Sequence, residues 1–384
     1  MRPTSIDPGA RDTVNHVNSS MKVLVATPLG RGGMGGIDRL MDQLRDRVDE
    51  AREDGVEIRF GVTRGKGHIA LSLLFLVSFC LLVLWQKING RVDLLHLNLA
   101  SNGSFKRKSL IAGFARFLQV PYVVHLHGGL FREFYSNSSQ RQQSAIQKLF
   151  GQAGGVIVLG SPWREFVLSI APDADVHILP NATHALTAGD RDGKTIEIAF
   201  LGRIGPKKGT QDLLAAAARI SSTVPWHLTL AGDGEVEEAR QQVSALGLED
   251  RVSLPGWLDD AASENLLERA DIVVLPSYIE NLPLSVIEGM GAGAAVVATP
   301  VGAVTDILTN EVNGLIVQPG DVEGLAAALD RLIGDPELRD RLGENARSTH
   351  REMLDIRSYL PRLAVIWKEA LTNASLDKKS NLNS

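Results

Sequence analysis

The sequence predicts an α/β protein built on two doubly wound, Rossmann-like sheets. The chain has 384 residues, 44% of them hydrophobic and 22% charged, which is an ordinary globular composition and enough length for two domains. Short apolar runs rich in β-branched residues alternate with helical patterns, first in one half and then again in the other. Polar stretches at 179–183 and 188–193 separate the two series and are typical of an interdomain linker.

Five strands are expected in each half of the chain. In the first half they are predicted at 23–26, 56–62, 94–98, 122–127 and 156–159. In the second half they are predicted at 196–201, 227–231, 252–254, 272–275 and 295–299. The runs are short and mostly apolar, as expected for strands that are covered by helices on both faces.

The division of the chain follows from this alternation. The expected parts are a disordered leader (1–20), a first domain (21–185), a second domain (186–352), a C-terminal helix (353–371) and a disordered tail (372–384). The C-terminal helix is amphipathic because its apolar residues have helical spacing, namely Leu360, Leu363, Ile366 and Trp367.

Two features indicate a cytoplasmic location. The leader is polar and lacks the apolar segment of a secretion signal. The single cysteine, Cys80, cannot form an internal disulfide and cannot build a cysteine zinc cluster, which fits a reducing compartment.

The net charge of −5 conceals an asymmetry between the halves. Residues 1–180 contain 21 Lys+Arg against 15 Asp+Glu, whereas residues 181–384 contain 19 against 30, so the halves carry +6 and −11. Between 61 and 120 one acid, Asp93, faces eight basic residues: Arg64, Lys66, Lys87, Arg91, Lys106, Arg107, Lys108 and Arg116. One face of the first domain is therefore expected to be basic. No aromatic platform or recognised binding module accompanies it, so nucleic acid is not an expected partner.

The same region contains an apolar run of 17 residues at 69–85, interrupted only by Ser72 and Ser78. This length is at the lower edge of what spans a bilayer, but a crossing would separate two strands of one domain. Two alternatives remain: a helix buried in the domain, or a helix that exposes apolar surface to a membrane. The second is favoured because Lys106, Arg107 and Lys108 would then lie near anionic headgroups.

Two carboxylates, Glu280 and Glu288, lie on either side of a turn that opens a helix. The turn follows the predicted strand at 272–275, and ligands of parallel α/β sheets gather at such carboxyl ends. Pro283 near the first helical turn leaves free N–H groups around Leu282 and Leu284 that can hold anionic oxygen. The carboxylates could then accept hydrogen bonds from hydroxyl groups of a sugar and a ribose. The alternative is that Glu280 caps the helix and Glu288 is solvated.

This block resembles the E-x7-E motif of the GT4 family of retaining glycosyltransferases, which is also described as glycosyl transferases group 1. The resemblance extends from about residue 21 to 371 and includes the stretches 291–302 and 313–317. It implies the GT-B fold, in which an acceptor-side domain and a nucleotide-sugar domain face a cleft and the C-terminal helix crosses back to the first domain. The turn at 281–283 reads Asn-Leu-Pro, where many members have Gly-Phe-Gly or Gly-Phe-Pro.

A glycine-rich loop follows the first predicted strand, and a helix is expected to begin near Ile37. Glycines let the backbone approach a diphosphate at a helix N-terminus. The G-x-G-x-x-G register of a dinucleotide-binding dehydrogenase is imperfect here. Gly35 and Gly36, followed by Ile37, Asp38 and Arg39, instead resemble the Gly-Gly-x-Glu-Arg start of GT4 members, which implies donor contacts for the two glycines.

His125 and His127 share one face of the fourth predicted strand, and His127 lies at its carboxyl edge, before Gly128 and Gly129. A metal site would need a third ligand that the sequence does not supply, so no metal is expected. A structural role is the default for His125. The resemblance implies that His127 contacts the donor sugar beside the reaction centre.

Two cations follow the first strand of the second domain. Arg203 and Lys208 are delivered to its carboxyl end, where guanidinium and ammonium groups suit a diphosphate leaving group. The alternative is a solvated basic turn. Both residues are in register with the Gly-Arg-Leu…Lys-Gly pattern of GT4 members. Gly232, Asp233 and Gly234, with 255–257, are expected to complete a nucleoside pocket.

The sequence therefore predicts a metal-independent, retaining glycosyltransferase of the hexosyltransferase type. Its donor would be a nucleotide-diphosphate sugar, with no separate cofactor. Arg203, Lys208 and the helix N–H groups would stabilise the departing phosphate, Glu280 would orient the sugar, and Glu288 would hold the ribose. A nucleotide-sugar 2-epimerase of the same fold and a non-catalytic scaffold are the alternatives.

The acceptor is inferred from the apolar run and its basic surroundings. They indicate a lipid-linked saccharide held at an anionic membrane surface. The expected location is the inner face of the bacterial plasma membrane, in exopolysaccharide or lipopolysaccharide biosynthesis.

Overall fold

The computed structural model describes residues 20–33, 35–65, 67, 71–187, 189, 191 and 194–382, and for residues 376–382 it describes only the backbone. The predicted disordered leader therefore lies outside the described residues, apart from Ser20. The linker stretch at 188–193 is described only at Gly189 and Arg191.

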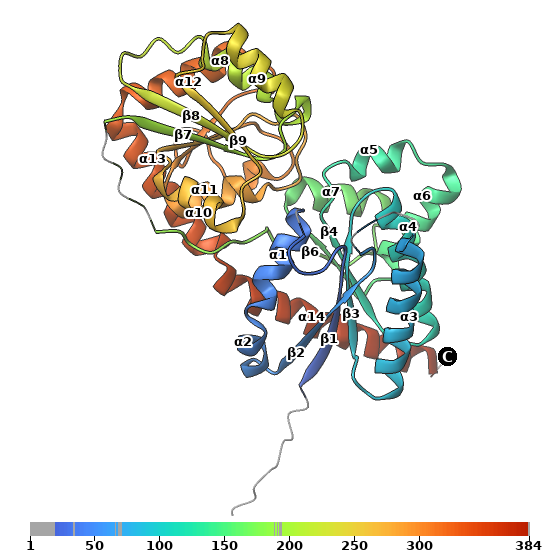
Figure 1. Ribbon diagram of the computed structural model, residues 1–384. Coiled ribbons are helices and arrows are strands. Elements are labelled where there is room, and N and C mark those ends of the chain that lie inside the picture. Colours follow the sequence, from blue (N-terminus) through green and yellow to red (C-terminus); the bar gives the residue numbers. More distant parts are fainter. Residues whose placement is uncertain are drawn as a thin grey trace, which may run out of the picture.

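Two parallel six-stranded sheets form the centres of two domains, which confirms the predicted fold class (Figure 1). The first sheet has the strand order β2-β1-β3-β4-β5-β6. Its strands are β1 (Met21–Thr27), β2 (Val56–Val62), β3 (Leu94–Leu99), β4 (Tyr122–Leu126), β5 (Gly155–Val158) and β6 (Val176–Ile178). The edge strand β6 was not predicted, since three residues are too few to show a periodicity.

The second sheet has the order β12-β11-β10-β7-β8-β9. Its strands are β7 (Ile196–Leu201), β8 (Trp226–Ala231), β9 (Val252–Gly256), β10 (Ile272–Leu275), β11 (Ala295–Ala298) and β12 (Leu315–Ile316). The strand order reverses beside β7, which pairs with β8 on one side and β10 on the other. Loops that follow β7 and β10 therefore diverge and leave a crevice at the carboxyl edge.

Helices cover both faces of each sheet. In the first domain they are α1 (Gly36–Arg45), α2 (Val48–Glu53), α3 (Ser72–Ile88), α4 (Gly103–Phe117), α5 (Phe131–Ser136), α6 (Gln140–Gly151) and α7 (Ser161–Ile170). In the second they are α8 (Thr210–Ala217), α9 (Val236–Ala245), α10 (Asp260–Arg269), α11 (Leu284–Ala292), α12 (Val322–Gly334) and α13 (Pro336–Thr349), with the short helical turns η2 (Pro206–Lys208), η3 (Val304–Asp306) and η4 (His350–Leu354).

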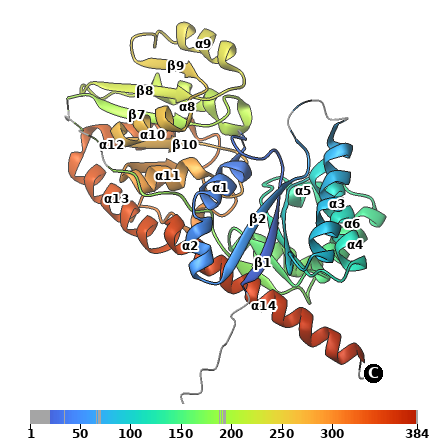
Figure 2. The ribbon, with the colours of Figure 1, turned by 60° about the horizontal axis from the view of Figure 1, so that its bottom comes forward.

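The last helix, α14 (Ile356–Leu382), returns from the second domain and lies along the first (Figures 1 and 2). Tyr359, Leu363 and Trp367 are buried in one apolar cluster with Val123 of β4 and Ile157 of β5. The helix continues past residue 371, so the predicted disordered tail is wrong as far as Leu382. Residues 372–382 contain neither Gly nor Pro, so a helix that packing has nucleated can extend through them at little cost.

The apolar run forms α3, and only one side of this helix is buried. Leu76, Phe79 and Val83 pack into the core, whereas the opposite side is exposed. The exposed apolar side chains on this flank of the domain are Leu71, Leu73, Leu74, Val77, Leu81, Trp85 and Ile88 of α3 and its N-cap, with Leu110 and Phe117 of α4. We call this set the apolar flank. The alternative of a wholly buried helix is therefore excluded. Within the described residues, no helix is long and apolar enough to cross a bilayer.

One part of the predicted basic surface is wrong. Lys108 is buried, and its Nζ donates a hydrogen bond to Thr63 Oγ1 at 2.7 Å. Burial, with a further contribution from Arg107, lowers the pKa of Lys108 to about 7. Lys106 remains exposed and Arg107 is half-buried, so two of the three residues are still accessible. Position 108 lies on the buried side of α4, because it is three residues from the buried Phe105 and from the buried Ile111.

Candidate active site in the interdomain cleft

Lys208 and Glu280 form an ion pair between two loops of the second domain. Lys208 ends the turn η2 after β7, and Glu280 follows β10. Because β7 and β10 are neighbouring strands, the two side chains can meet across the crevice between the loops. Glu280 also accepts a hydrogen bond from Ser277 Oγ at 2.8 Å. Its side chain is 11% exposed and that of Lys208 is 26% exposed. Glu280 does not cap α11, whose N-cap is Pro283, so the alternative of a helix-capping role is excluded.

Arg203 lies at the same edge of the sheet but is more exposed. Its guanidinium is 3.3 Å from Asp233 Oδ2, and its side chain is 71% exposed. Gly232 and Gly234 have positive φ values, and a Cβ on either would overlap the carbonyl oxygen of Gly202 or Ile204. The glycines therefore allow the two loops to pack against each other. One part of the expected nucleoside pocket is thus brought together, because the loop after β8, which carries Asp233, lies beside Arg203.

Glu288 is buried, so the alternative of a solvated side chain is wrong. Its Oε1 accepts from Arg39 Nη2 at 2.8 Å, although Arg39 belongs to the first domain. Its Oε2 is buried with no hydrogen-bond partner among the described residues. Burial raises the pKa of the Glu288 carboxyl, and Arg39 opposes this shift. The unpaired oxygen can accept a hydrogen bond from a hydroxyl group.

The first turn of α11 lies next to the glycine-rich loop of the first domain. Leu284 begins the helix, and the first N–H groups of a helix have no acceptors within it. No side chain caps this first turn either, so these N–H groups are available to a ligand. The Leu284 side chain would lie 3.8 Å from a Cβ placed on Gly36, which itself begins α1 after Gly35. Leu282 is buried, and its carbonyl accepts a hydrogen bond from Asn181 in the first domain. Gly36 and Leu284, two of the predicted donor-binding residues, are thus neighbours across the domains.

His127 follows β4 directly and lies at the contact between the domains. A Cβ on Gly129 would be 2.7 Å from the carbonyl carbon of Glu280. Asn281 Nδ2 donates to Leu126 O at 3.2 Å across the same contact. Burial, with a smaller effect of His96, lowers the pKa of His127 to about 3, so its imidazole is neutral at physiological pH. The structure therefore places His127 beside the loop that carries Glu280.

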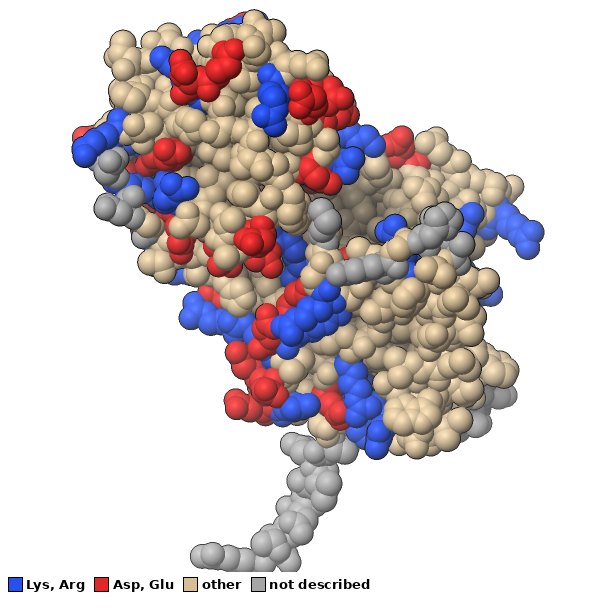
Figure 3. Space-filling model, viewed as in Figure 1, with Lys and Arg blue, Asp and Glu red and all other residues tan. Residues whose placement is uncertain are grey.

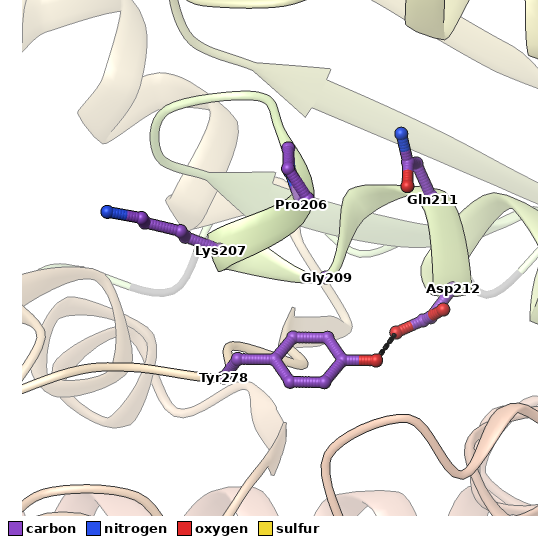
Figure 4. Close-up of a pocket in the computed structure, with 6 residues that line it drawn as sticks. All are labelled: Pro206, Lys207, Gly209, Gln211, Asp212 and Tyr278. Carbon is purple, nitrogen blue, oxygen red and sulfur yellow. Dashed lines mark hydrogen bonds between the residues drawn. The ribbon is translucent and has the colours of Figure 1, made fainter.

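The space-filling view shows a hollow between the two domains (Figure 3). A separate pocket of about 320 Å³ lies on the second domain, lined by Pro206, Lys207, Gly209, Gln211, Asp212 and Tyr278. Figure 4 shows the Tyr278 hydroxyl pointing at Asp212, with which it forms a 2.7 Å hydrogen bond, whereas Lys207 points away. None of the predicted site residues lines this pocket, although Lys208 lies between two residues that do. Lys207 and Lys208 therefore have different surroundings.

Sequence reasoning assigned no role to Arg39, Asn98 or Asn281, which the structure places at the site. Arg39 lies three residues after Gly36 in the glycine-rich stretch, and this position could have indicated that it belongs to the site. No local sequence pattern could have indicated the contacts of Asn98 and Asn281, because these contacts join segments far apart in the chain. The described residues contain no group of three or more His, Cys, Asp or Glu arranged to hold a metal ion.

Residues 187–349 match the protein family described as Glycosyl transferases group 1. The chain is 30% identical over 278 residues to alpha-D-kanosaminyltransferase of Streptomyces kanamyceticus. The aligned region covers 66% of this chain and 72% of that protein. It is 34% identical over 211 residues to lipopolysaccharide core biosynthesis glycosyltransferase LpsD of Rhizobium meliloti (strain 1021). That second match covers 53% of this chain and 57% of the relative.

Solved structures share the two-domain arrangement. Sucrose-phosphate synthase from Thermosynechococcus elongatus superposes with a TM-score of 0.74 at 19% identity, over 92% of this chain and 99% of the other. HepE from Anabaena in complex with UDP-glucose superposes with a TM-score of 0.70 at 21% identity, over 91% and 99%. At these identities the likeness concerns the fold, and it confirms the expected GT-B architecture.

Proposed function

Because the chain belongs to the glycosyl transferases group 1 family, we propose that it transfers a sugar from a nucleotide-diphosphate donor to a saccharide acceptor, with retention of anomeric configuration and without a metal ion. The finer GT4 and hexosyltransferase assignments are part of this proposal. The observation that carries it is the convergence of Lys208, Glu280 and the uncapped first turn of α11 at the contact between the domains. HepE, whose structure holds UDP-glucose, has the same fold, which supports a nucleotide-sugar donor.

In the proposed reaction the bond between the anomeric carbon and the donor phosphate breaks, and a bond to an acceptor hydroxyl oxygen forms on the same face of the sugar. The acceptor proton passes to the leaving phosphate. Negative charge develops on that phosphate, where Lys208, Arg203 and the N–H groups at the start of α11 would stabilise it. Glu280 would orient the sugar, and Glu288 Oε2 would accept from a ribose hydroxyl.

The acceptor is proposed to be lipid-linked, in bacterial cell-surface polysaccharide biosynthesis at the inner face of the plasma membrane. The relative LpsD acts in lipopolysaccharide core biosynthesis, which supports this class of acceptor. The apolar flank supports docking at an anionic membrane, because exposed Leu and Trp side chains lie near the exposed cations Lys87, Arg91 and Lys106.

Slow donor hydrolysis tests the proposal. The purified protein would be incubated with single nucleotide sugars, and release of free nucleoside diphosphate and sugar would be followed by chromatography. One donor is expected to be hydrolysed with release of the sugar as its original anomer, and Lys208→Ala is expected to slow this release roughly 100-fold or more. An epimerase would instead return an isomerised nucleotide sugar or free epimer. A scaffold would leave all donors intact, which would refute the proposed activity.

A further inference from the structure

A chain of buried polar side chains joins the crossing helix α14 to His127. Trp367 Nε1 donates to His96 Nδ1 at 3.1 Å. His96 Nε2 lies 3.3 Å from Asn98 Oδ1, and His127 Nε2 lies 2.8 Å from the same oxygen. Trp367, His96 and Asn98 are fully buried. The chain therefore runs from the core under α14 to the contact between the domains.

The donors and acceptors in this chain are determined by its two ends. An indole nitrogen can only donate, so His96 Nδ1 must accept and carries no proton. Burial lowers the pKa of His96 to about 4, so the ring is neutral and its single proton lies on Nε2. His96 Nε2 thus donates to the amide oxygen of Asn98.

The orientation of the Asn98 amide is determined independently by the backbone. Its Nδ2 donates to the carbonyl oxygen of Ala26 at 3.3 Å. Rotating the amide by 180° would place two oxygens against each other and would remove the acceptor from both histidines. Asn98 Oδ1 therefore faces both rings, and an amide oxygen cannot donate. His127 Nε2 must be the donor in the 2.8 Å contact.

This leaves His127 Nδ1 as an unprotonated acceptor. Nδ1 has no hydrogen-bond partner among the described residues, and it is not fully buried. The other ring beside it is His125, whose centroid lies 3.9 Å away and whose nitrogens have no partners in the described part of the chain. Gly128 and Gly129 then lead the backbone to the loop of Glu280.

We propose that Asn98 is a positioning residue that fixes His127 as the neutral Nε2–H tautomer, so that Nδ1 presents a lone pair that accepts a hydrogen bond from a sugar hydroxyl. The sugar as ligand rests on the proposed function, whereas the tautomer rests on the geometry of this chain alone. Trp367 and His96 extend the positioning to α14. A ligand without a hydroxyl donor at this position would leave the lone pair unpaired and would be bound less well.

Nitrogen-15 NMR of the full-length protein labelled at histidine tests the tautomer without substrate. The two nitrogen shifts of neutral His127 are expected to show protonated Nε2 and unprotonated Nδ1 at pH 7. In Asn98→Leu, which removes the acceptor oxygen, this preference is expected to be lost. A wild-type His127 protonated at Nδ1 would overturn the proposal even if Asn98→Leu failed to fold.

A matched tryptophan pair tests the far end of the chain. Trp367→Phe removes the donor to His96 and is expected to change the His96 nitrogen shifts. Trp226→Phe removes a buried indole N–H that has no acceptor among the described residues, and it should leave those shifts unchanged. If both variants gave the wild-type His96 spectrum, Trp367 would have no part in the positioning.

Kinetics connect the tautomer to catalysis. Asn98→Leu is expected to lower kcat roughly 10–100-fold, by analogy with the loss when a group that orients a metal-ligating histidine is removed. The donor KM is expected to change by less than about threefold, because the histidine acts mainly on the reacting sugar. An unchanged kcat with an altered tautomer would refute the catalytic part. If the tautomer were found and no nucleotide sugar were cleaved, the proposed function would fail and the positioning by Asn98 would stand.

Discussion

Lys208 and Arg203 show how burial separates two cations at one sheet edge. The Lys208–Glu280 pair is mostly shielded from water, whereas Arg203 is 71% exposed. A charge in a partly buried site acts on a developing phosphate charge with less screening than an exposed one. Lys208 is therefore expected to contribute more to transition-state stabilisation than its exposed neighbour Lys207.

Lys208→Ala is expected to lower kcat of transfer or donor hydrolysis roughly 100-fold or more, as when a single charge-stabilising group is removed from other active sites. Arg203→Ala is expected to act in the same direction, because its guanidinium lies at the same edge. Steady-state kinetics at saturating donor would measure both. Lys207→Ala is the matched control, since Lys207 points away from the Asp212–Tyr278 pair and lies outside the ion pair. Equal losses in Lys207→Ala and Lys208→Ala would contradict the assigned role.

A second prediction at this scale concerns His350. Its side chain is buried, and its Nε2 lies at hydrogen-bond distance, 3.0 Å, from Thr183 Oγ1. Burial lowers the pKa of His350 to about 4, although Asp355 opposes this shift. Since the unfolded chain takes up this proton near pH 6.5, its contribution to stability is complete above that pH and is lost as the pH falls from about 6.5 toward 4.

His350→Gln is therefore expected to remove up to about 2 kcal/mol of the drop in unfolding free energy between pH 7 and pH 5. Denaturant titrations of both proteins at the two pH values would measure this. Other groups contribute equally to both proteins, so the comparison isolates position 350. An identical pH dependence in the two proteins would show that His350 does not titrate in this window.

At the scale of elements, α3 combines two roles on opposite sides. Phe79 and Val83 are core residues, while Leu74 and Leu81 are 63% and 60% exposed. Trp85, at the end of the exposed side, lies under the guanidinium of Arg91 at 5.3 Å from the ring centroid. Apolar side chains beside exposed cations are the combination that binds an anionic bilayer.

A double variant that carries both Leu74→Glu and Leu81→Glu is expected to lose flotation with vesicles that contain anionic lipid. The two changes place negative charge on the surface that would enter the headgroup region. The fold should persist, since both positions are exposed. Val312→Glu, an exposed apolar position in the second domain, is the control and should float like the wild type. A wild-type protein that stays at the bottom of the gradient would refute membrane docking and favour a soluble acceptor.

For the molecule as a whole, the two domains touch through a few close contacts. Arg39 pairs with Glu288, Ser161 N donates to Asp306, and Gly129 lies against the backbone of Glu280. The linker and the start of α14 lie side by side, because Thr183 N donates to Leu354 O and Ile356 N donates to Thr183 O. Both connections between the domains therefore pass through one place, about which the domains could rotate.

Gly129→Ala is expected to hold the domains apart, because its Cβ would lie 2.7 Å from the carbonyl carbon and 2.8 Å from the carbonyl oxygen of Glu280. The expected results are a larger radius of gyration in small-angle X-ray scattering and a lower kcat, with unchanged circular dichroism. Gly151→Ala is the control, since a Cβ there meets nothing within 4 Å. Wild-type scattering and kcat in Gly129→Ala would show that this contact can yield.

Local sequence was sufficient for the fold class, for ten of the strands and for the choice of candidate site residues. Parallel strands that are buried on both faces consist of short apolar runs, and turns that hold phosphate need glycine. Both features can therefore be recognised in a short stretch of sequence. Lys208, Glu280 and His127 could be chosen because each lies at or beyond the carboxyl end of a predicted strand and matches a position in the pattern of the family that the sequence resembles. Their roles stay predictions until the variants are measured.

The partners of these residues depended on how distant segments pack. That Glu288 meets Arg39, that Lys108 is buried, and that Asn98 connects His96 to His127 are all contacts between segments far apart in the chain. The exposed side of α3 is another case, because a helix that is apolar all round carries no periodicity to indicate which side will be covered. Burial and pairing arise from the folded arrangement of both domains, and no window of neighbouring residues contains that information.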